Sequence, residues 1–334
     1  MNIEQLNKDF EKLNLLREKN SMDRIKFCWK LIESDNNEYL EYNLFLSNKA
    51  NKYFSKDLQE QFQFRKDKEK VFYFLQDKLE QNTSDKLKTI INKIIKELDF
   101  KSLDEYQTWI KDIKLGKKND ENDFVWSIMK SPFVELHYEL MKDEELSEGF
   151  RKSLNTRYNE HSEKGEALLL SKLDNNDDVD FHGEIIFILG KIKGPKKGEV
   201  LTHARKLVKS KNVYTRNRAI IVLGWIGEST DFEILENCLL YDLDKECRAW
   251  SATAFYIVYD RIKSKEFKTN TFKLFNKVLE SEKDFFVLGM IIYSMRELTN
   301  KKFGISQKAI DELDVEKIVL TKEKIKRYLI KSVC

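Results

Sequence analysis

The sequence predicts an all-α protein, and three observations support that prediction. Glycine and proline are scarce, with 11 and 2 among 334 residues, whereas a sheet protein of this size needs many turns built from them. Apolar residues recur at the three- and four-residue spacing of amphipathic helices, and from about residue 163 a pair of helices repeats. An all-β fold is therefore excluded, and 22 Phe, 13 Tyr and 5 Trp argue against long-range disorder.

Residues 1–160 are predicted to form a helical N-terminal region, made either of degenerate repeats or of a separate cap. The clearest amphipathic stripe runs through 87–98, where isoleucine and leucine recur at helical intervals. Ser84 and Ser102 stand where helix N-caps belong, and a glutamate three residues after Ser102 completes a capping-box pattern. The polar run 116–122 is the predicted flexible connection.

Residues 161–300 are predicted to repeat a helical hairpin four times. The second helix of each hairpin is strongly apolar, and these helices start 34, 32 and 39 residues apart. A lone hairpin cannot bury its apolar face, so the hairpins must stack on one another. This predicts a right-handed α-solenoid, capped by helices in 301–334. The first helices are expected at 163–173, 197–209, 230–241 and 269–280, and the second at 181–190, 215–224, 247–256 and 286–295.

The second helices resemble those of HEAT repeats, whose usual pattern is an apolar residue, arginine, then small residues and Leu-Gly. Residues 215–224 read Thr-Arg-Asn-Arg-Ala-Ile-Ile-Val-Leu-Gly and match well, and 247–256 matches at its arginine and small residues. His182 and Val287 stand at the arginine position of the two outer segments. The resemblance covers roughly 163–300 and implies a helical binding scaffold.

The resemblance also implies a structural role for Arg216 and Arg248. In HEAT-like arrays this arginine bonds an acidic or amide residue in the preceding turn or in a neighbouring repeat. Asn212 and Asp244 each precede one of these arginines by four residues, so local partners are available. Contact with a ligand is the alternative role for the two arginines.

The strongest local signal is the charge of the basic segment, residues 191–218, which carries ten basic residues and one acid, a net charge of +9. The following stretch, 228–246, has a net charge of −6. One explanation of this pattern is charge pairing between neighbouring repeats. The other is that the basic segment is a surface that binds an acidic protein or nucleic acid. Apart from Arg216, the basic residues are the candidate partner-binding residues: Lys191, Lys193, Lys196, Lys197, Arg205, Lys206, Lys209, Lys211 and Arg218.

Two tryptophans add to this candidate surface. Trp225 and Trp250 fall within or just after second helices, which usually line the concave face of a HEAT array. Aromatic side chains beside cations can anchor a protein partner or stack on bases. The alternative is that both rings fill the core between repeats.

Catalysis finds little support, so no catalytic, metal-binding or cofactor-binding residue is predicted, although a lone catalytic carboxylate is left open. HEAT-like iron hydroxylases carry repeated His-Glu pairs on equivalent helices, whereas here the pairs at 137/139, 160/161 and 182/184 are unevenly placed. Glycine-rich phosphate loops are absent. We therefore expect a chain that is not an enzyme.

The sequence is typical of a cytoplasmic protein without a membrane span. The first ten residues carry charges where a secretory signal needs an apolar run, and no stretch of 18 uncharged apolar residues occurs. Cys28, Cys238, Cys247 and Cys334 form no CxxC motif. This is typical of free thiols in a reducing compartment.

Two functions are consistent with these features. HEAT arrays are generally binding scaffolds, and Lys/Asn-rich bacterial examples include toxin-neutralising immunity proteins. The resemblance thus favours a non-enzymatic protein-binding scaffold, in the specific form of an immunity protein that occludes its partner. The alternative is nucleic-acid binding through the basic segment. The alkylpurine DNA glycosylases, also built of HEAT-like repeats, use a basic concave face, aromatic residues and one Asp, for which no position is assigned here.

Overall fold

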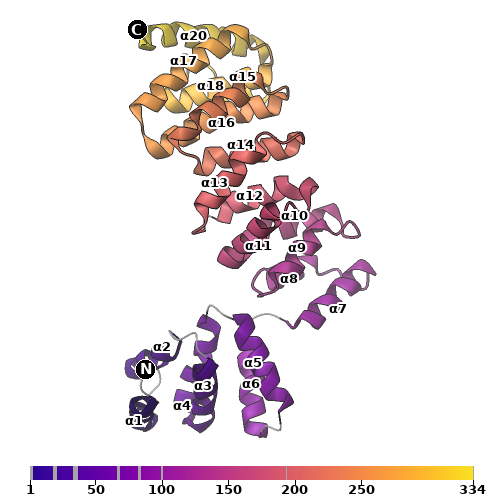
Figure 1. Ribbon diagram of the computed structural model, residues 1–334, viewed down its shortest axis with the longest axis vertical. Helices are drawn as coiled ribbons and strands as arrows, with labels where there is room; N and C mark the ends of the chain where they lie inside the picture. The colour runs from indigo at the N-terminus through magenta and orange to yellow at the C-terminus, as the bar shows by residue number, and fades with distance from the viewer. Residues whose placement is uncertain are drawn as a thin grey trace. The chain divides into compact units, whose positions relative to one another are not determined.

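The computed structural model consists of helices and the turns that join them over the residues that it describes, which are 3–17, 21–32, 37–65, 68–81, 84–98, 101–192 and 194–333 (Figure 1). No strand occurs among them, so the all-α prediction is confirmed. Lys193 and Cys334, both named above, lie outside the described residues. The described helices include none with the length and apolarity that a bilayer crossing needs.

The chain divides into two units, residues 1–157 and 158–334. In the first unit, Phe10 stacks on Phe54 with ring centroids 5.3 Å apart in an apolar core. The first unit comprises α1 (Ile3–Asn14), α2 (Met22–Ile32), α3 (Asn37–Lys49), α4 (Lys52–Glu60), η1 (Gln61–Phe64), α5 (Lys68–Glu80), α6 (Asp85–Glu97), α7 (Leu103–Lys114), α8 (Glu121–Ile128), α9 (Val134–Lys142) and α10 (Glu148–Arg157).

Local sequence signals set the helix starts in this unit. The Ser84 side chain accepts from the Leu87 N–H at the start of α6. Ser102 and Glu105 form both bonds of a capping box at the start of α7. These bonds satisfy backbone donors that the first turn of a helix leaves free. The N-cap predictions at Ser84 and Ser102 are confirmed.

The second unit repeats a helical hairpin along its length. Its first three hairpins each pair an outer with an inner helix at nearly the predicted residues. A longer outer helix, α17, opens the fourth hairpin. The unit comprises η2 (Tyr158–His161), α11 (Ser162–Asp174), η3 (Val179–Phe181), α12 (His182–Ile192), α13 (Lys197–Leu207), α14 (Val213–Ile226), η4 (Ser229–Asp231), α15 (Phe232–Tyr241), α16 (Lys245–Ile262), α17 (Lys265–Ser281), α18 (Phe285–Thr299), α19 (Gln307–Asp311) and α20 (Val315–Val333).

The hairpins stack into two layers, which makes this unit an α-solenoid. Helices α12, α14, α16 and α18 pack each on the next and form the inner layer, while α11, α13, α15 and α17 form the outer layer. Helix α20 packs against α17 and α18 (Figure 1). It spans Val315–Val333, within the 301–334 region where capping helices were predicted.

The polar turn before each of three inner helices fixes where that helix starts. The side chains of Asn212, Asp244 and Asp284 accept hydrogen bonds from backbone N–H groups in the first turns of α14, α16 and α18. Each turn thus ends in an N-cap. These three outer-to-inner turns therefore end in the same extended, side-chain-capped conformation.

Small residues let neighbouring inner helices approach closely. A Cβ placed on Gly224 would lie 3.2 Å from both Cα and Cβ of Ala254 on α16. Further along, Ser294 on α18 donates to the Ala252 carbonyl at 2.9 Å. The glycine of the repeat pattern therefore marks the place where the backbones of α14 and α16 nearly touch.

Candidate functional site

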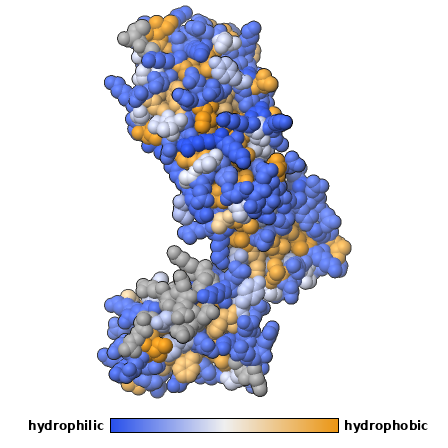
Figure 2. Space-filling view, in the orientation of Figure 1, coloured by the Kyte–Doolittle hydropathy of each residue, from blue (hydrophilic) through white to orange (hydrophobic). Residues whose placement is uncertain are grey.

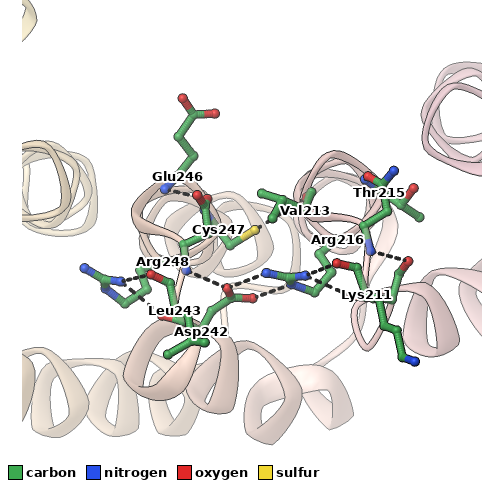
Figure 3. A network of polar contacts seen from close by, with 12 residues as sticks. Lys211, Val213, Thr215, Arg216, Asp242, Leu243, Glu246, Cys247 and Arg248 are labelled. Atoms are coloured by element: carbon green, nitrogen blue, oxygen red, sulfur yellow. Dashed lines mark hydrogen bonds and ion pairs between the residues drawn. The ribbon is translucent and has the colours of Figure 1, made fainter. Parts of the chain in front are cut away.

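The two repeat arginines link successive hairpins through carboxylates, and Figure 3 shows the pair of Arg216 with Asp242. Arg216 at the start of α14 donates twice to Asp242 in the next hairpin, at 2.9 and 3.0 Å. Its remaining nitrogen donates to the carbonyls of Ser210 and Lys211, at 2.9 and 3.1 Å. The pair is mostly buried, with side-chain exposures of 15% and 7%, so Arg216 joins one turn to the next.

Arg248 repeats this arrangement one hairpin later. It donates to Glu282 at 2.9 Å and to the carbonyls of Asp242 and Leu243 at 3.0 and 3.2 Å. The side-chain partners that the sequence suggested, Asn212 and Asp244, cap helices instead. Both arginines therefore bond the neighbouring repeat and not the side chain four residues earlier.

The carboxylates in these pairs stay charged. Burial by itself would raise the pKa of Asp242, but the Arg216 hydrogen bonds and the Asp244 N–H bring that pKa below its ordinary value. The pKa of Glu282 is likewise lowered by Arg248 and backbone N–H groups against the effect of burial. Two bonded guanidinium groups therefore outweigh the desolvation of their partners.

Part of the basic segment is neutralised by nearby acids. Arg205 on α13 donates to the buried Asp231 at 2.6 and 3.2 Å. Lys196 lies 3.4 Å from Glu199. The net charge of the segment therefore overstates the positive charge that a partner would meet.

The exposed lysines of the segment lie at two separate places. Lys196 and Lys197 are exposed at the start of α13, and Lys206, Lys209 and Lys211 are exposed near its end. At 1.5 Å per residue, the two groups are roughly 15–20 Å apart along the helix. The structure does not bring the predicted partner-binding lysines into one patch.

The solvent-facing side of the inner layer brings other predicted residues together. We call this side the inner face. Its half-exposed or exposed residues recur at helical spacing on each inner helix, which is the pattern of one open stripe. These residues are Glu184, Phe187 and Lys191 on α12, Tyr214, Arg218, Ile221 and Trp225 on α14, Trp250 and Ile257 on α16, and Met290 and Tyr293 on α18.

Two cations of the inner face share one aromatic ring. The Lys191 ammonium lies 4.3 Å from the Phe187 ring centroid, and the Arg218 guanidinium lies 4.1 Å from the same centroid. Arg218 also lies 4.8 Å from the Tyr214 ring, and the Trp225 ring is 5.0 Å from that of Phe187. We call these five residues the aromatic–cation cluster.

The cluster holds its cations without ion pairs to the residues that the structure describes. Arg218 and Lys191 form none there, and the buried Arg218 Nε finds no hydrogen-bond acceptor among the same residues. Burial and the charge of Arg218 lower the pKa of Lys191, against a smaller opposite effect of Glu184. Glu184 accepts from the Tyr214 hydroxyl. The cluster is therefore a poorly compensated positive site.

Trp250 also lies on the inner face, and among the described residues no ring or cation contact joins it to this cluster. It is half-exposed on α16, seven residues before Ile257 on the same stripe. Figure 2 shows a mostly hydrophilic surface over α15–α18 with separate hydrophobic patches. Both predicted tryptophans are thus neither fully buried nor fully exposed.

The side chains of His137, His182 and Cys28 are buried in the fold. Ring nitrogens of His137 and His182 donate to the carbonyls of Leu154 and Asp177 at 3.0 and 2.8 Å. No group of His, Cys, Asp and Glu in the described ranges is arranged to hold a metal ion. Burial raises the pKa of the Cys28 thiol to about 12.

Sequence reasoning missed Phe187 and Tyr214, which hold the two cations of the cluster. The signal was present, because Glu184, Phe187 and Lys191 are spaced as one helix face. That signal identifies a stripe on α12, but which residues of α14 lie beside it depends on how the two hairpins are aligned. Asp242 and Glu282 could not be predicted as partners of the arginines for the same reason.

Comparison with known proteins agrees with this architecture. A family model described as HEAT repeats matches residues 166–255, the stretch that begins in α11 and ends in α16. No curated protein matches the chain. The match covers the hairpins that carry the aromatic–cation cluster and both repeat arginines. Residues 166–255 of this chain therefore belong to the HEAT-repeat family.

Proposed function

We propose that this chain is a non-enzymatic protein-binding scaffold whose inner face binds an acidic protein partner. HEAT repeats suggest a helical scaffold for protein interaction. The observation that carries the proposal is the aromatic–cation cluster, where Lys191 and Arg218 share the Phe187 ring and form no ion pair with a carboxylate in the described part of the chain.

The cluster is suited to bind carboxylates. Two like charges beside one ring repel each other, and burial adds a desolvation cost. A partner carboxylate between them would relieve both effects and satisfy the Arg218 Nε. Arginine, tyrosine and tryptophan are also the residues enriched among interface hot spots. The free protein therefore holds a site whose electrostatic energy falls when an acid binds.

The exposed lysines on and after α13 suggest a second contribution to partner binding, which is faster association. Lys206, Lys209 and Lys211 lie on or just after an outer-layer helix and not on the inner face. Charges outside the buried interface chiefly speed association. We propose that these lysines steer an acidic partner toward the inner face without contributing most of the affinity.

In its specific form, the proposal is a cytoplasmic immunity protein that neutralises a toxin by occlusion. An inner face that clamps the partner would cover the partner's own functional surface. Nucleic acid is the competing occupant. The Arg205–Asp231 pair and the separation of the exposed lysines both reduce the continuous run of free cations that phosphate contacts need.

The test is capture of the partner by the tagged chain from native cells, with and without nuclease. We expect one stoichiometric acidic protein that survives nuclease. Lys191→Glu combined with Arg218→Glu should abolish its capture. Lys206→Glu, Lys209→Glu and Lys211→Glu together should leave capture intact and slow association several-fold.

Two outcomes of that test would overturn the proposal. Capture that is lost on nuclease treatment would transfer the function to nucleic-acid binding. A protein partner that the Lys191→Glu, Arg218→Glu variant still captures, while circular dichroism shows that variant folded, would remove the inner face as the binding surface.

A further inference from the structure

A pocket of about 290 Å³ opens where the inner helices α12 and α14 end. Leu189, Val200 and Ile226 give it an apolar wall, and Trp225 contributes an aromatic one. Its polar groups come from three other helices or turns. The described residues that line it are Glu166, Leu189, Gly194, Lys197, Val200, Trp225, Ile226 and Arg261.

The base of the pocket carries a buried carboxylate. Glu166 on α11 is 1% exposed, and the only bonds that it accepts from the described residues are long ones from the Lys196 N–H, at 3.3 and 3.4 Å. Gly194 makes this placement possible, because a Cβ there would overlap the carboxylate. Glu166 therefore retains acceptor capacity for a donor that enters the pocket.

The rim carries the opposite charge. Lys197 and Arg261 are both exposed, and neither forms an ion pair within the described ranges. Arg261 donates one long bond to the Gly224 carbonyl, at 3.4 Å. The pocket thus has one anionic base, an aromatic wall and a cationic rim.

These features select among side chains that a partner could insert. A lysine or arginine would meet two cations at the rim, and an aspartate or glutamate would meet Glu166 at the base. A leucine or phenylalanine would bring no donor to the buried carboxylate, which would keep only the long bonds from the Lys196 N–H. A tyrosine satisfies every group, because its ring can pack on Trp225 while its hydroxyl donates to Glu166.

We propose that this pocket binds a tyrosine of the partner protein, flanked by acidic residues that contact Lys197 and Arg261. The proposal rests on the proposed function and names the partner's anchor. At about 290 Å³ the pocket is just below the usual range for drug-sized ligands and suits one large side chain.

The test uses the acetylated tripeptide amide Asp-Tyr-Asp, titrated into the folded chain. Binding is read from the Trp225 indole N–H resonance, assigned with Trp225→Phe. We expect the Asp-Phe-Asp peptide to bind about tenfold more weakly, since it lacks a hydrogen bond to a charged group. Lys-Tyr-Lys should also bind more weakly than Asp-Tyr-Asp.

Two variants identify the groups responsible. Glu166→Gln keeps the shape but removes the charge, so the tyrosine preference over phenylalanine should fall by about fivefold. Arg261→Gln, on an exposed residue, should reduce the preference for aspartate flanks and leave the tyrosine preference unchanged. Thermal unfolding of both variants serves as the folding control.

Equal binding of the tyrosine and phenylalanine peptides would overturn the proposal. So would displacement of Asp-Tyr-Asp by adenosine monophosphate at equal or lower concentration, which would identify a nucleotide site. Lys191→Glu with Arg218→Glu should leave peptide binding in place. Failure of the pocket with intact partner capture would therefore overturn this inference alone.

Discussion

Replacing Asp242 by alanine should destabilise the contact between successive hairpins more than any surface charge change. Asp242 receives two hydrogen bonds from Arg216 and one from the Asp244 N–H. Its side chain is 7% exposed and that of Arg216 is 15% exposed. The substitution therefore leaves a guanidinium group largely desolvated and without its carboxylate.

The size of this effect follows from the geometry. Removing one partner of a buried ion pair costs about 3–5 kcal/mol. Arg216 keeps its two carbonyl acceptors, at 2.9 and 3.1 Å, and some access to water. These contacts place the expected loss at the lower end of the range, about 3 kcal/mol.

Native-state hydrogen exchange of the α14 and α16 amides measures this loss as a free energy of opening. Asp260→Ala is the matched control, because Asp260 and Lys263 form an ion pair that is 75% and 64% exposed. That control should cost about 0.5 kcal/mol or less. Replacing both Arg216 and Asp242 by apolar residues should recover much of the loss. Equal effects of Asp242→Ala and Asp260→Ala would refute the reasoning.

Three further predictions follow from the same structure. The pKa values of Asp242 and Glu282 are below their ordinary range. The stability that these two carboxylates contribute is therefore complete above about pH 5 and is lost as pH falls through their folded-state pKa values. Because Arg248 lowers the pKa of Glu282, Arg248→Met should flatten the pH dependence of the free energy of unfolding below pH 5. Gly224→Leu should cost about 2 kcal/mol, because its Cβ would lie 3.2 Å from Ala254, whereas Gly198→Leu, with nothing within 4 Å of its Cβ, should not destabilise the chain in thermal melts. The Cys28 thiol, with its pKa raised to about 12 by burial, should resist iodoacetamide at pH 8 until urea unfolds the chain, and rapid alkylation of the native protein, read by mass spectrometry, would contradict this.

The elements of the solenoid could be predicted because their signals are local. Helical periodicity and polar turns ending in Asn212, Asp244 and Asp284 identify each inner helix and its start. Partners across the stack could not be predicted in this way. Arg216 bonds Asp242, which lies 26 residues later in the sequence, and Arg248 bonds Glu282, which lies 34 residues later. Which residues meet across such separations depends on how the hairpins are aligned, and no short sequence pattern encodes that alignment.

The candidate site was predicted only in part for the same reason. A count of charges in 191–218 includes Arg205, but the structure pairs it with Asp231. The same count cannot distinguish Arg218, held over two aromatic rings, from lysines on the outer layer. Whether a charge is paired depends on which residues lie close to it in space. The inner face could therefore be identified only from the packed helices.

The most direct test of the account is the affinity of the captured partner for two charge-reversed variants. One carries Lys191→Glu and Arg218→Glu on the inner face, and the other carries Lys206→Glu, Lys209→Glu and Lys211→Glu on and after α13. We predict that the first loses at least a hundredfold in affinity, mainly through faster dissociation, and that the second changes only the association rate. Equal losses in both variants, or a larger loss in the second, would contradict binding at the inner face.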